Sequence, residues 1–175
     1  MTIRPVRPED ADALRELRLE ALRTCPVALT ADPGEAEAHP PSWWREMAER
    51  NGGDATGVIM LAETDLAGGG AALRLAGMAG IWVSTNPKLS HAGTLWGVYV
   101  RPSFRGSGVG SRLVMACIDW ARAKPLAVVR LGVAVGNDAA IRCYERCGFV
   151  PYGIEPLTVR WEGRYYDEVL MALHL

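Results

Sequence analysis

The chain has 175 residues, 49% of them hydrophobic and 22% charged, with a formal net charge of −1 at pH 7. This length and composition predict one globular domain over residues 1–175, and the near-zero charge argues against partners such as nucleic acid or an anionic membrane. The N-terminus has no apolar stretch like that of a signal peptide, and no segment approaches about 18 uninterrupted apolar residues. The four cysteines lack C-x-x-C spacing and are interpreted as reduced thiols, so we expect a cytoplasmic protein.

The N-terminal part of the chain predicts a strand, a helix and a loop. Thr2 to Val6 is expected to be a short strand, and a helix is expected to begin near Pro8 and to end at Pro26. The buried face of this helix is expected to contain Leu14, Leu17 and Ala21. The segment Val27–Pro41 contains three prolines, a glycine and scattered acids, which predicts a loop.

A short second helix and a pair of strands are expected next. Ser42 is the expected N-cap of this helix, and Gly52 is expected to end it. Val58–Glu63 predicts a strand, and Ala71–Val83 predicts its longer partner. The intervening segment, TDLAGGG, is expected to be a flexible hairpin loop.

The most informative stretch runs from Leu95 to Arg122. The apolar run Leu95–Val100 has the length of a buried strand, which Pro102 ends because proline cannot donate to a sheet ladder. The glycine-rich turn RGSGVG follows, and from Val109 the apolar period changes to that of a helix, with Cys117 on the buried face. Free N–H groups at the start of such a helix attract anions, and small residues let a phosphate approach them.

The spacing of the glycines excludes two common phosphate-binding motifs. A dinucleotide fingerprint or a P-loop beginning at Gly106 would need glycine at position 111, where Ser111 stands. A P-loop would then need lysine followed by serine or threonine, but Arg112 and Leu113 are found there. A nucleotide-binding fold is therefore disfavoured, and a glycine-rich turn that only starts a helix stays as the simpler alternative.

The C-terminal part predicts a strand, a helix and a hairpin. Leu126–Val135 is a β-branched, apolar run that we expect to be a buried strand parallel to the central one. Asn137 is the expected N-cap of the last helix, and Gly148 is its expected left-handed end. The apolar side of that helix is expected to contain Ala140, Ile141, Tyr144 and Cys147. Val150–Trp161 and Tyr165–Leu173 predict a closing hairpin.

Two motifs in this order resemble the signatures of the GNAT N-acetyltransferase superfamily. The first, V-x-V and then R-G-x-G-x-G between Val98 and Ser111, resembles its coenzyme A pyrophosphate loop. The second, NDAAIRCYERCGF between Asn137 and Phe149, resembles the family's pattern of asparagine, alanine, tyrosine and Gly-Phe. The expected element order, β-α-α-β-β-β-α-β-α-β-β, is also that of the GNAT fold. The resemblance implies an α/β (α+β) GNAT-like fold, with a mixed central sheet of about six to seven strands flanked by about four helices.

The resemblance also implies an activity and a set of binding residues. The activity is that of an acetyl-CoA-dependent N-acetyltransferase, which moves an acetyl group to a primary amine of a small molecule or protein by direct attack within a ternary complex. The implied coenzyme-binding residues are Val98, Tyr99, Val100, Arg105, Gly106, Ser107, Gly108, Val109, Gly110, Ser111, Asn137 and Ala140. Backbone groups of the loop would hold the pyrophosphate without a metal, and Gly97 would let the central strand bulge away from its neighbour. Separately from the resemblance, the spacing of Cys143 and Cys147, four residues apart on the expected helix, could suggest a metal or redox pair, but with no further ligand nearby the two are expected to pack.

The proton-transfer residues are less well defined. Tyr144 resembles the family tyrosine that protonates the departing coenzyme thiolate, and a hydrogen-bonded core tyrosine is the structural alternative. The general base stays unassigned, because the family's strand glutamate is missing and His91 and Glu63 are only weak candidates. This leaves open a non-catalytic, acyl-CoA-binding GNAT-like module, and a homodimer is also left open. The acceptor is unidentified. Two segments expected to line its site mix aromatic residues with acids, which would suit a cationic amine, although a solvated surface explains the acids equally well. They are Val27–Pro41 and the hairpin near Tyr165, Tyr166, Asp167 and Glu168.

Overall fold

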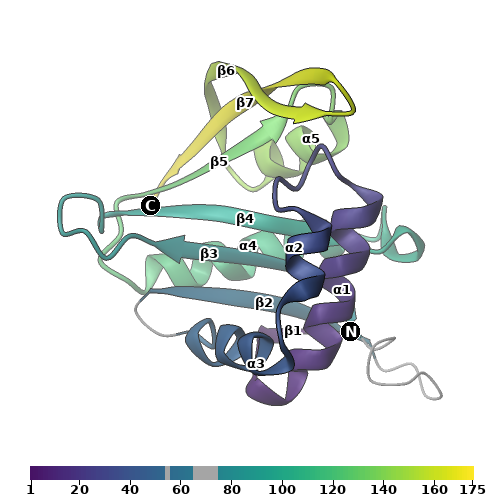
Figure 1. Ribbon diagram of the computed structural model, residues 1–175. Helices are drawn as coiled ribbons and strands as arrows, with labels where there is room; N and C mark the ends of the chain where they lie inside the picture. Colours follow the sequence, from purple (N-terminus) through teal and green to yellow (C-terminus); the bar gives the residue numbers. More distant parts are fainter. Residues whose placement is uncertain (54–55, 65–74) are drawn as a thin grey trace.

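A seven-stranded mixed sheet lies at the centre of the computed structural model, which describes residues 1–53, 56–64 and 75–175 (Figure 1). The strand order is β1-β2-β3-β4-β5-β7-β6. Neighbouring strands are antiparallel except β4 and β5, which are parallel because α4 crosses between them. The strands are β1 Thr2–Pro5, β2 Gly57–Glu63, β3 Leu75–Val83, β4 Ala92–Val100, β5 Val128–Ala134, β6 Val150–Trp161 and β7 Arg164–His174.

Helices cover both faces of this sheet (Figure 1). The helices in front, in the view of Figure 1, are α1 Ala11–Thr24, α2 Pro33–Ala38 and α3 Pro41–Arg50, and those behind are α4 Val109–Arg122 and α5 Asp138–Arg146. Single 3₁₀ turns also lie at Pro8–Asp10 and Pro102–Phe104. None of the helices in the described part of the chain has the length and apolar character needed to cross a bilayer.

The hydrophobic core has one part on each face of the sheet. On the rear face, buried side chains of α4 such as Leu113 cluster with Val129 of β5. On the front face, Leu17 of α1 clusters with Ile59 of β2. The buried face of α1 includes the three residues predicted from sequence, Leu14, Leu17 and Ala21. The side chains of each interior strand therefore divide between two cores, as alternation along a strand requires.

The order of elements agrees with the sequence prediction apart from one helix. α2 lies inside the segment 27–41, which the sequence predicts to be a loop, so the described residues contain five α-helices rather than about four. The prediction for Ser42 is also wrong, because α3 begins at Pro41, and proline is well suited to the first helical position. The predicted loop at 65–70 and the first residues of the predicted strand at 71–83 lie outside the described residues.

A bulge in β4 and a short pairing with β5 shape the middle of the sheet. Two residues of β4, Gly97 and Val98, lie opposite Ala79 of β3 alone, and Gly97 has a φ of 64°, in the left-handed region that favours glycine. β4 and β5 pair over Ala92–Thr94 and Val128–Arg130, at the start of both strands. The irregular pairing at Gly97 confirms the predicted bulge. Beyond Thr94, β4 and β5 no longer pair, so the sheet is open at that point.

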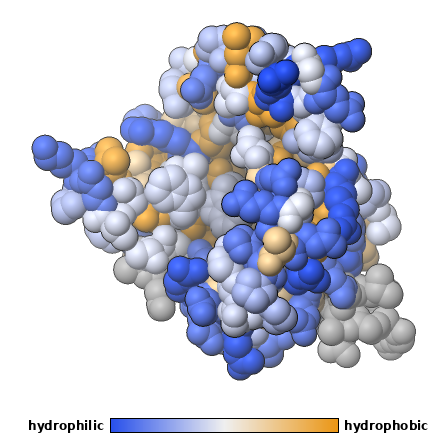
Figure 2. Space-filling view, viewed as in Figure 1, coloured by the Kyte–Doolittle hydropathy of each residue, from blue (hydrophilic) through white to orange (hydrophobic). Residues whose placement is uncertain are grey.

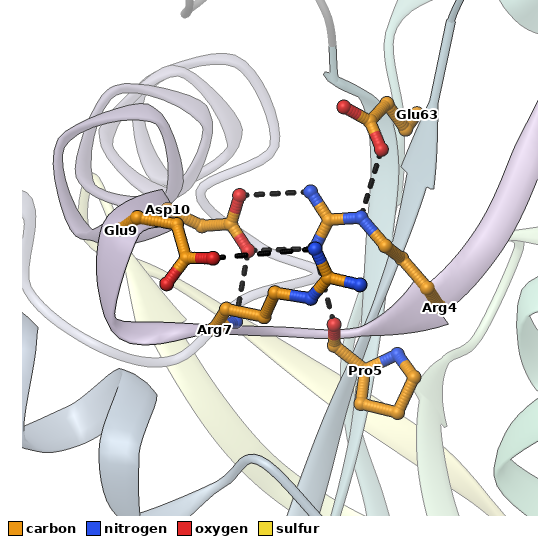
Figure 3. A network of polar contacts seen from close by, with 6 residues as sticks. All are labelled: Arg4, Pro5, Arg7, Glu9, Asp10 and Glu63. Atoms are coloured by element: carbon orange, nitrogen blue, oxygen red, sulfur yellow. Dashed lines mark hydrogen bonds and ion pairs between the residues drawn. The ribbon is translucent and has the colours of Figure 1, made fainter.

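A polar network at the β1 edge of the sheet joins β1 to the helix that follows it (Figure 3). Arg4 donates from Nη1 and Nη2 to the two carboxylate oxygens of Asp10 (2.7 and 2.8 Å) and from Nε to Oε2 of Glu63 (2.8 Å). The backbone N–H of Arg7 donates to Asp10 as well (2.8 Å). Burial by itself would raise the pKa of Asp10, but the hydrogen bonds from Arg4 and Arg7 outweigh it, and the pKa is lowered. The network engages Glu63 structurally, which removes one weak candidate for a general base.

Candidate functional site

A cavity of about 1040 Å³ opens where β4 and β5 separate. Most of its lining comes from the second half of β4, the glycine-rich loop, the end of β5, α5, and residues of α1 and the segment after it, and single residues come from β3, β6 and β7. Figure 2 views the molecule from the side of α1 and α2, and hydrophobic atoms show between these helices and the part built by β6 and β7. The cavity therefore reaches residues from both faces of the sheet.

The glycine-rich loop forms one end of this cavity. Gly106 and Gly108 have φ of 78° and 81°, and a Cβ placed on either would meet no atom within 4 Å. Gly108 precedes the first residue of α4, so the first N–H groups of that helix have no partner within the helix. Arg105 is exposed beside the loop and donates from Nε to the carbonyl of Val100 (3.0 Å). Open backbone, free N–H groups and an adjacent cation together fit a phosphate.

The structure brings together nearly all the coenzyme-binding residues predicted from sequence. Those that line the cavity are Val98, Tyr99, Val100, Arg105, Gly106, Gly108, Val109, Gly110, Ser111, Asn137 and Ala140. Ser107 is the exception, since it is exposed and its hydroxyl donates to the carbonyl of Phe104 (2.6 Å) instead. Asn137 caps α5 as predicted, with its side chain accepting from the N–H of Ala140 (3.4 Å).

Tyr144 projects from α5 into the same cavity. Its residue is 8% exposed, and its ring packs edge-to-face against Phe149 with ring centres 6.1 Å apart. Burial, reinforced by the nearby thiols of Cys143 and Cys147, raises the pKa of Tyr144, so the phenol keeps its proton at neutral pH. Its hydroxyl makes no hydrogen bond to any described residue, unlike the hydrogen-bonded core tyrosine of the structural alternative. Tyr144 therefore brings a protonated phenol to the lining of the cavity.

Cys143 of α5 and Cys147, which caps the end of that helix, both contact Ser111 of α4. The thiol of Cys143 lies 3.3 Å from the hydroxyl of Ser111, and that of Cys147 lies 3.8 Å from the Ser111 carbonyl. These contacts hold α5 against the start of α4. In the described ranges, no three His, Cys, Asp or Glu side chains gather in a way that could hold a metal ion.

Glu168 of β7 supplies a carboxyl group to the lining of the cavity, although the sequence indicates it only as one of several acids near the closing hairpin. His91 is exposed at the start of β4, and neither His91 nor Glu63 lines the cavity. Glu168 of β7 does line it, and its carboxyl group lies over Gly132 of β5, where a Cβ would come within 2.5 Å of it. Burial first, and then the charge of Glu155, raise the pKa of Glu168. A carboxyl group with a raised pKa is suited to exchanging a proton with an amine.

Arg18 of α1 is the functional candidate that sequence reasoning missed. It lines the cavity beside the β4 bulge, with Nη1 3.0 Å from a Cβ placed on Gly97 and Cζ 5.2 Å from the ring centre of Trp96. Nη1 is buried and has no hydrogen-bond partner among the described residues. Burial lowers the pKa of Arg18 to about 10, which still leaves the guanidinium charged at neutral pH.

Comparison with known proteins identifies the family. A sequence model of the acetyltransferase (GNAT) family matches residues 12–149, well over half of the chain. The chain belongs to the GNAT acetyltransferase family. Among solved structures, a GNAT-family acetyltransferase from Streptococcus pneumoniae superposes on this GNAT chain with a TM-score of 0.83, at 23% identity and 99% coverage of both chains. The Salmonella typhimurium protein yncA, solved with its cofactor acetyl-CoA, gives a TM-score of 0.78 at 24% identity, over 100% of this chain and 94% of that one. At these identities the structural likeness establishes the GNAT fold.

Curated relatives match a shorter stretch of this GNAT chain. An L-methionine sulfoximine/L-methionine sulfone acetyltransferase of Pseudomonas aeruginosa is 40% identical over 78 residues, which is 45% of each protein. An L-amino acid N-acyltransferase of Escherichia coli is 33% identical over 78 residues, again 45% of each protein. The matched stretch is therefore less than half of the length of these relatives.

Proposed function

We propose that this GNAT chain is an acetyl-CoA-dependent N-acetyltransferase that moves an acetyl group to a primary amine by direct attack within a ternary complex. One observation carries the proposal: an open anion-binding loop and a proton-donating tyrosine line the same cavity, where the sheet is split. A loop that only started a helix would need neither the split nor the tyrosine. The acetyl-CoA in the yncA structure and the names of the relatives support the same donor and reaction class.

Each group of residues in the cavity has its own role in the proposed acetyl transfer. Acetyl-CoA supplies an acetyl group on a thioester, and the amine nitrogen takes the acetyl group as the carbon–sulfur bond breaks. The N–H groups at the start of α4 hold the pyrophosphate, assisted by Arg105. The backbone of Val98 and the N–H of Val100 offer hydrogen bonds beside the split, where β4 has no β5 partner, while the Val100 carbonyl already accepts from Arg105. Tyr144 gives its proton to the departing thiolate, and the amine loses one proton to a base or to solvent.

The acceptor is proposed at the level of a small amine. Several curated relatives are named for the acetylation or acylation of amino acids or their analogues, including a phosphinothricin N-acetyltransferase of Streptomyces coelicolor. Another relative, from Mycobacterium tuberculosis, is named as an N-alpha-acetyltransferase. A free proton donor in the cavity favours turnover over the alternative of a non-catalytic acyl-CoA-binding module. The four free cysteines support work in a reducing compartment such as the cytoplasm.

Two measurements test the proposal. Coenzyme A without added metal should raise the melting temperature in a thermal-shift titration, because ligands that bind only the folded state stabilise it. Thiol release from acetyl-CoA should depend on an added amine from a panel of amino acids, polyamines and peptide N-termini. No stabilisation at millimolar coenzyme A would contradict the binding site, and binding without amine-dependent thiol release would establish the non-catalytic module instead.

A further inference from the structure

Arg18 is a half-buried cation whose Nη1 is fully buried, and it has no charged partner among the described residues. Two other half-buried arginines of the fold are neutralised: Arg4 by Asp10 and Glu63, and Arg101 by Glu20 at 2.9 Å. Arg18 instead has the ring of Trp96 against it and an orphaned Nη1. An unpaired buried charge is strongly unfavourable unless something else compensates it. The position therefore fits an anion that arrives from outside the chain.

The guanidinium lies on the face of the sheet opposite to the coenzyme loop. Trp96, which it contacts, packs with the front core of α1, whereas Tyr144 and the first residue of α4, Val109, belong to the rear core. Gly97, where β4 bulges, lies between the two faces and leaves room for Arg18 at the split. If the coenzyme binds at the start of α4 on the rear face, the front end of the cavity stays open for the acceptor. Arg18 is thus placed at the acceptor end.

We propose that Arg18 binds a carboxylate of the acceptor, so that the acceptor is an amino acid, an amine that carries its own anion. The inference rests on the proposed acetyl transfer and specifies its substrate class. Arginine suits this task because its planar guanidinium can donate two parallel hydrogen bonds to one carboxylate. A polyamine or another purely cationic acceptor would meet repulsion at the same place.

A second group on the front face supports a zwitterionic acceptor. Leu131 and Val133 of β5 face the rear core, so Gly132 between them faces the front, and the carboxyl group of Glu168 lies over it. The cavity therefore contains both a cation and a carboxyl group on its acceptor side. An amino acid offers the complementary pair, a carboxylate for Arg18 and an ammonium group for Glu168. The raised pKa of Glu168 suits removal of a proton from that ammonium group.

The test compares matched acceptors that differ only in the anion. Proteinogenic L-amino acids and their C-terminal amides are assayed by thiol release from acetyl-CoA, with spermidine as an amine without any anion. Chemistry alone favours the amides, because their amines are less basic and are neutral to a greater extent. We expect kcat/KM to favour the acids by at least about tenfold, as a charge-assisted pair permits.

Variants of Arg18 then assign the preference to its side chain. Arg18→Gln should lower kcat/KM for the preferred amino acid by about 10- to 100-fold and leave that for its amide within about threefold. Arg18→Lys, which keeps the charge but not the fork, should retain part of the preference. Arg15→Gln, the same change on α1 outside the cavity, is the control and should behave as wild type.

The possible outcomes separate this inference from the proposed function. Preference for amides or spermidine would overturn the amino-acid inference while acetyl transfer stands. An equal loss of coenzyme A affinity in Arg18→Gln would assign Arg18 to a coenzyme phosphate and would also overturn it. If the wild-type protein acetylates no amine, the proposed acetyl transfer is wrong. The inference about Arg18 is then tested by calorimetric titration of the coenzyme A-saturated protein with the same amino acids. Binding that Arg18→Gln abolishes supports the inference, and no binding overturns it.

Discussion

Replacing Tyr144 with phenylalanine removes one hydroxyl group and leaves the ring in place. The ring is held by its edge-to-face packing on Phe149, which phenylalanine reproduces. The hydroxyl has no hydrogen-bond partner among the described residues, so the substitution breaks no bond within the protein. Tyr144→Phe therefore isolates the proton donor from the packing.

The structure sets the expected size of both effects. With no hydrogen bond to lose, the free energy of unfolding should change by less than about 0.5 kcal/mol, below the roughly 1 kcal/mol of a typical hydrogen bond. General acid catalysis typically contributes 10²–10⁴-fold, so kcat should fall by about that factor while the affinity for acetyl-CoA hardly changes. Because burial raises the pKa of Tyr144, the wild-type rate should show no loss of this proton near neutral pH.

Steady-state kinetics beside a denaturation curve measure the two effects. Tyr165→Phe on β7 is the matched control, since Tyr165 is exposed and lies outside the cavity. If Tyr144→Phe kept its turnover within about threefold of wild type, the reasoning would be wrong and the tyrosine would be a packing residue. A large loss of stability in Tyr144→Phe would equally refute it, because it would reveal a bond that the structure does not contain.

Two further substitutions test the coenzyme loop and the edge network. Gly108→Val places a β-branched residue at a φ of 81° and should raise the Kd for coenzyme A by more than about tenfold, with a strain cost of about 1–3 kcal/mol. If calorimetry found a normal affinity of Gly108→Val for coenzyme A, the loop would be a turn that only starts the helix and not a binding site. Asp10→Asn should lower the free energy of unfolding by about 2 kcal/mol, because Arg4 loses a charged partner. Since the pKa of Asp10 is lowered on folding, this stability is present above about pH 4, the unfolded pKa, and is lost as pH falls through the folded one. Urea titrations at several pH values should find that the variant lacks this dependence.

Much of the fold could be predicted because its signals are local. The change of period at Val109, the cap at Asn137 and the left-handed end at Gly148 all depend on neighbouring residues. α2 was harder to predict because none of its residues is buried, so it has no apolar stripe. Its local signal is the side chain of Asp32, which accepts from Glu35, with proline at the first helical position. The same prolines and acids also predict a loop. Only the cap at Asp32, followed directly by proline, favours a short helix over a loop in this segment.

The candidate site could be predicted only in part, for a similar reason. The coenzyme loop is one continuous motif, whereas the acceptor end joins Arg18 to β4 and to Glu168 of β7 through the fold. Nothing in the sequence brings residues so far apart in the chain together. One signal for Arg18 was present: it lies four residues after Leu14 and three before Ala21, within the buried face of α1. A charged residue inside an apolar stripe indicates a buried charge, and buried charges need partners.

The absence of a partner for Arg18 also has a consequence for stability. The shift of its pKa from an ordinary 12.5 to about 10 corresponds to about 3 kcal/mol of unfavourable desolvation. The contact with Trp96 returns about 1–2 kcal/mol of this, so the charge costs the free protein about 1–2 kcal/mol. Arg18→Met keeps an apolar side chain beside Trp96 and removes the charge, so it should raise the melting temperature by a few degrees. Arg15→Met, on the same helix but outside the cavity, should not, because Arg15 has no orphaned buried nitrogen. A destabilised Arg18→Met protein would mean that the charge is compensated within the folded chain, and it would remove the reason for an anion at this position.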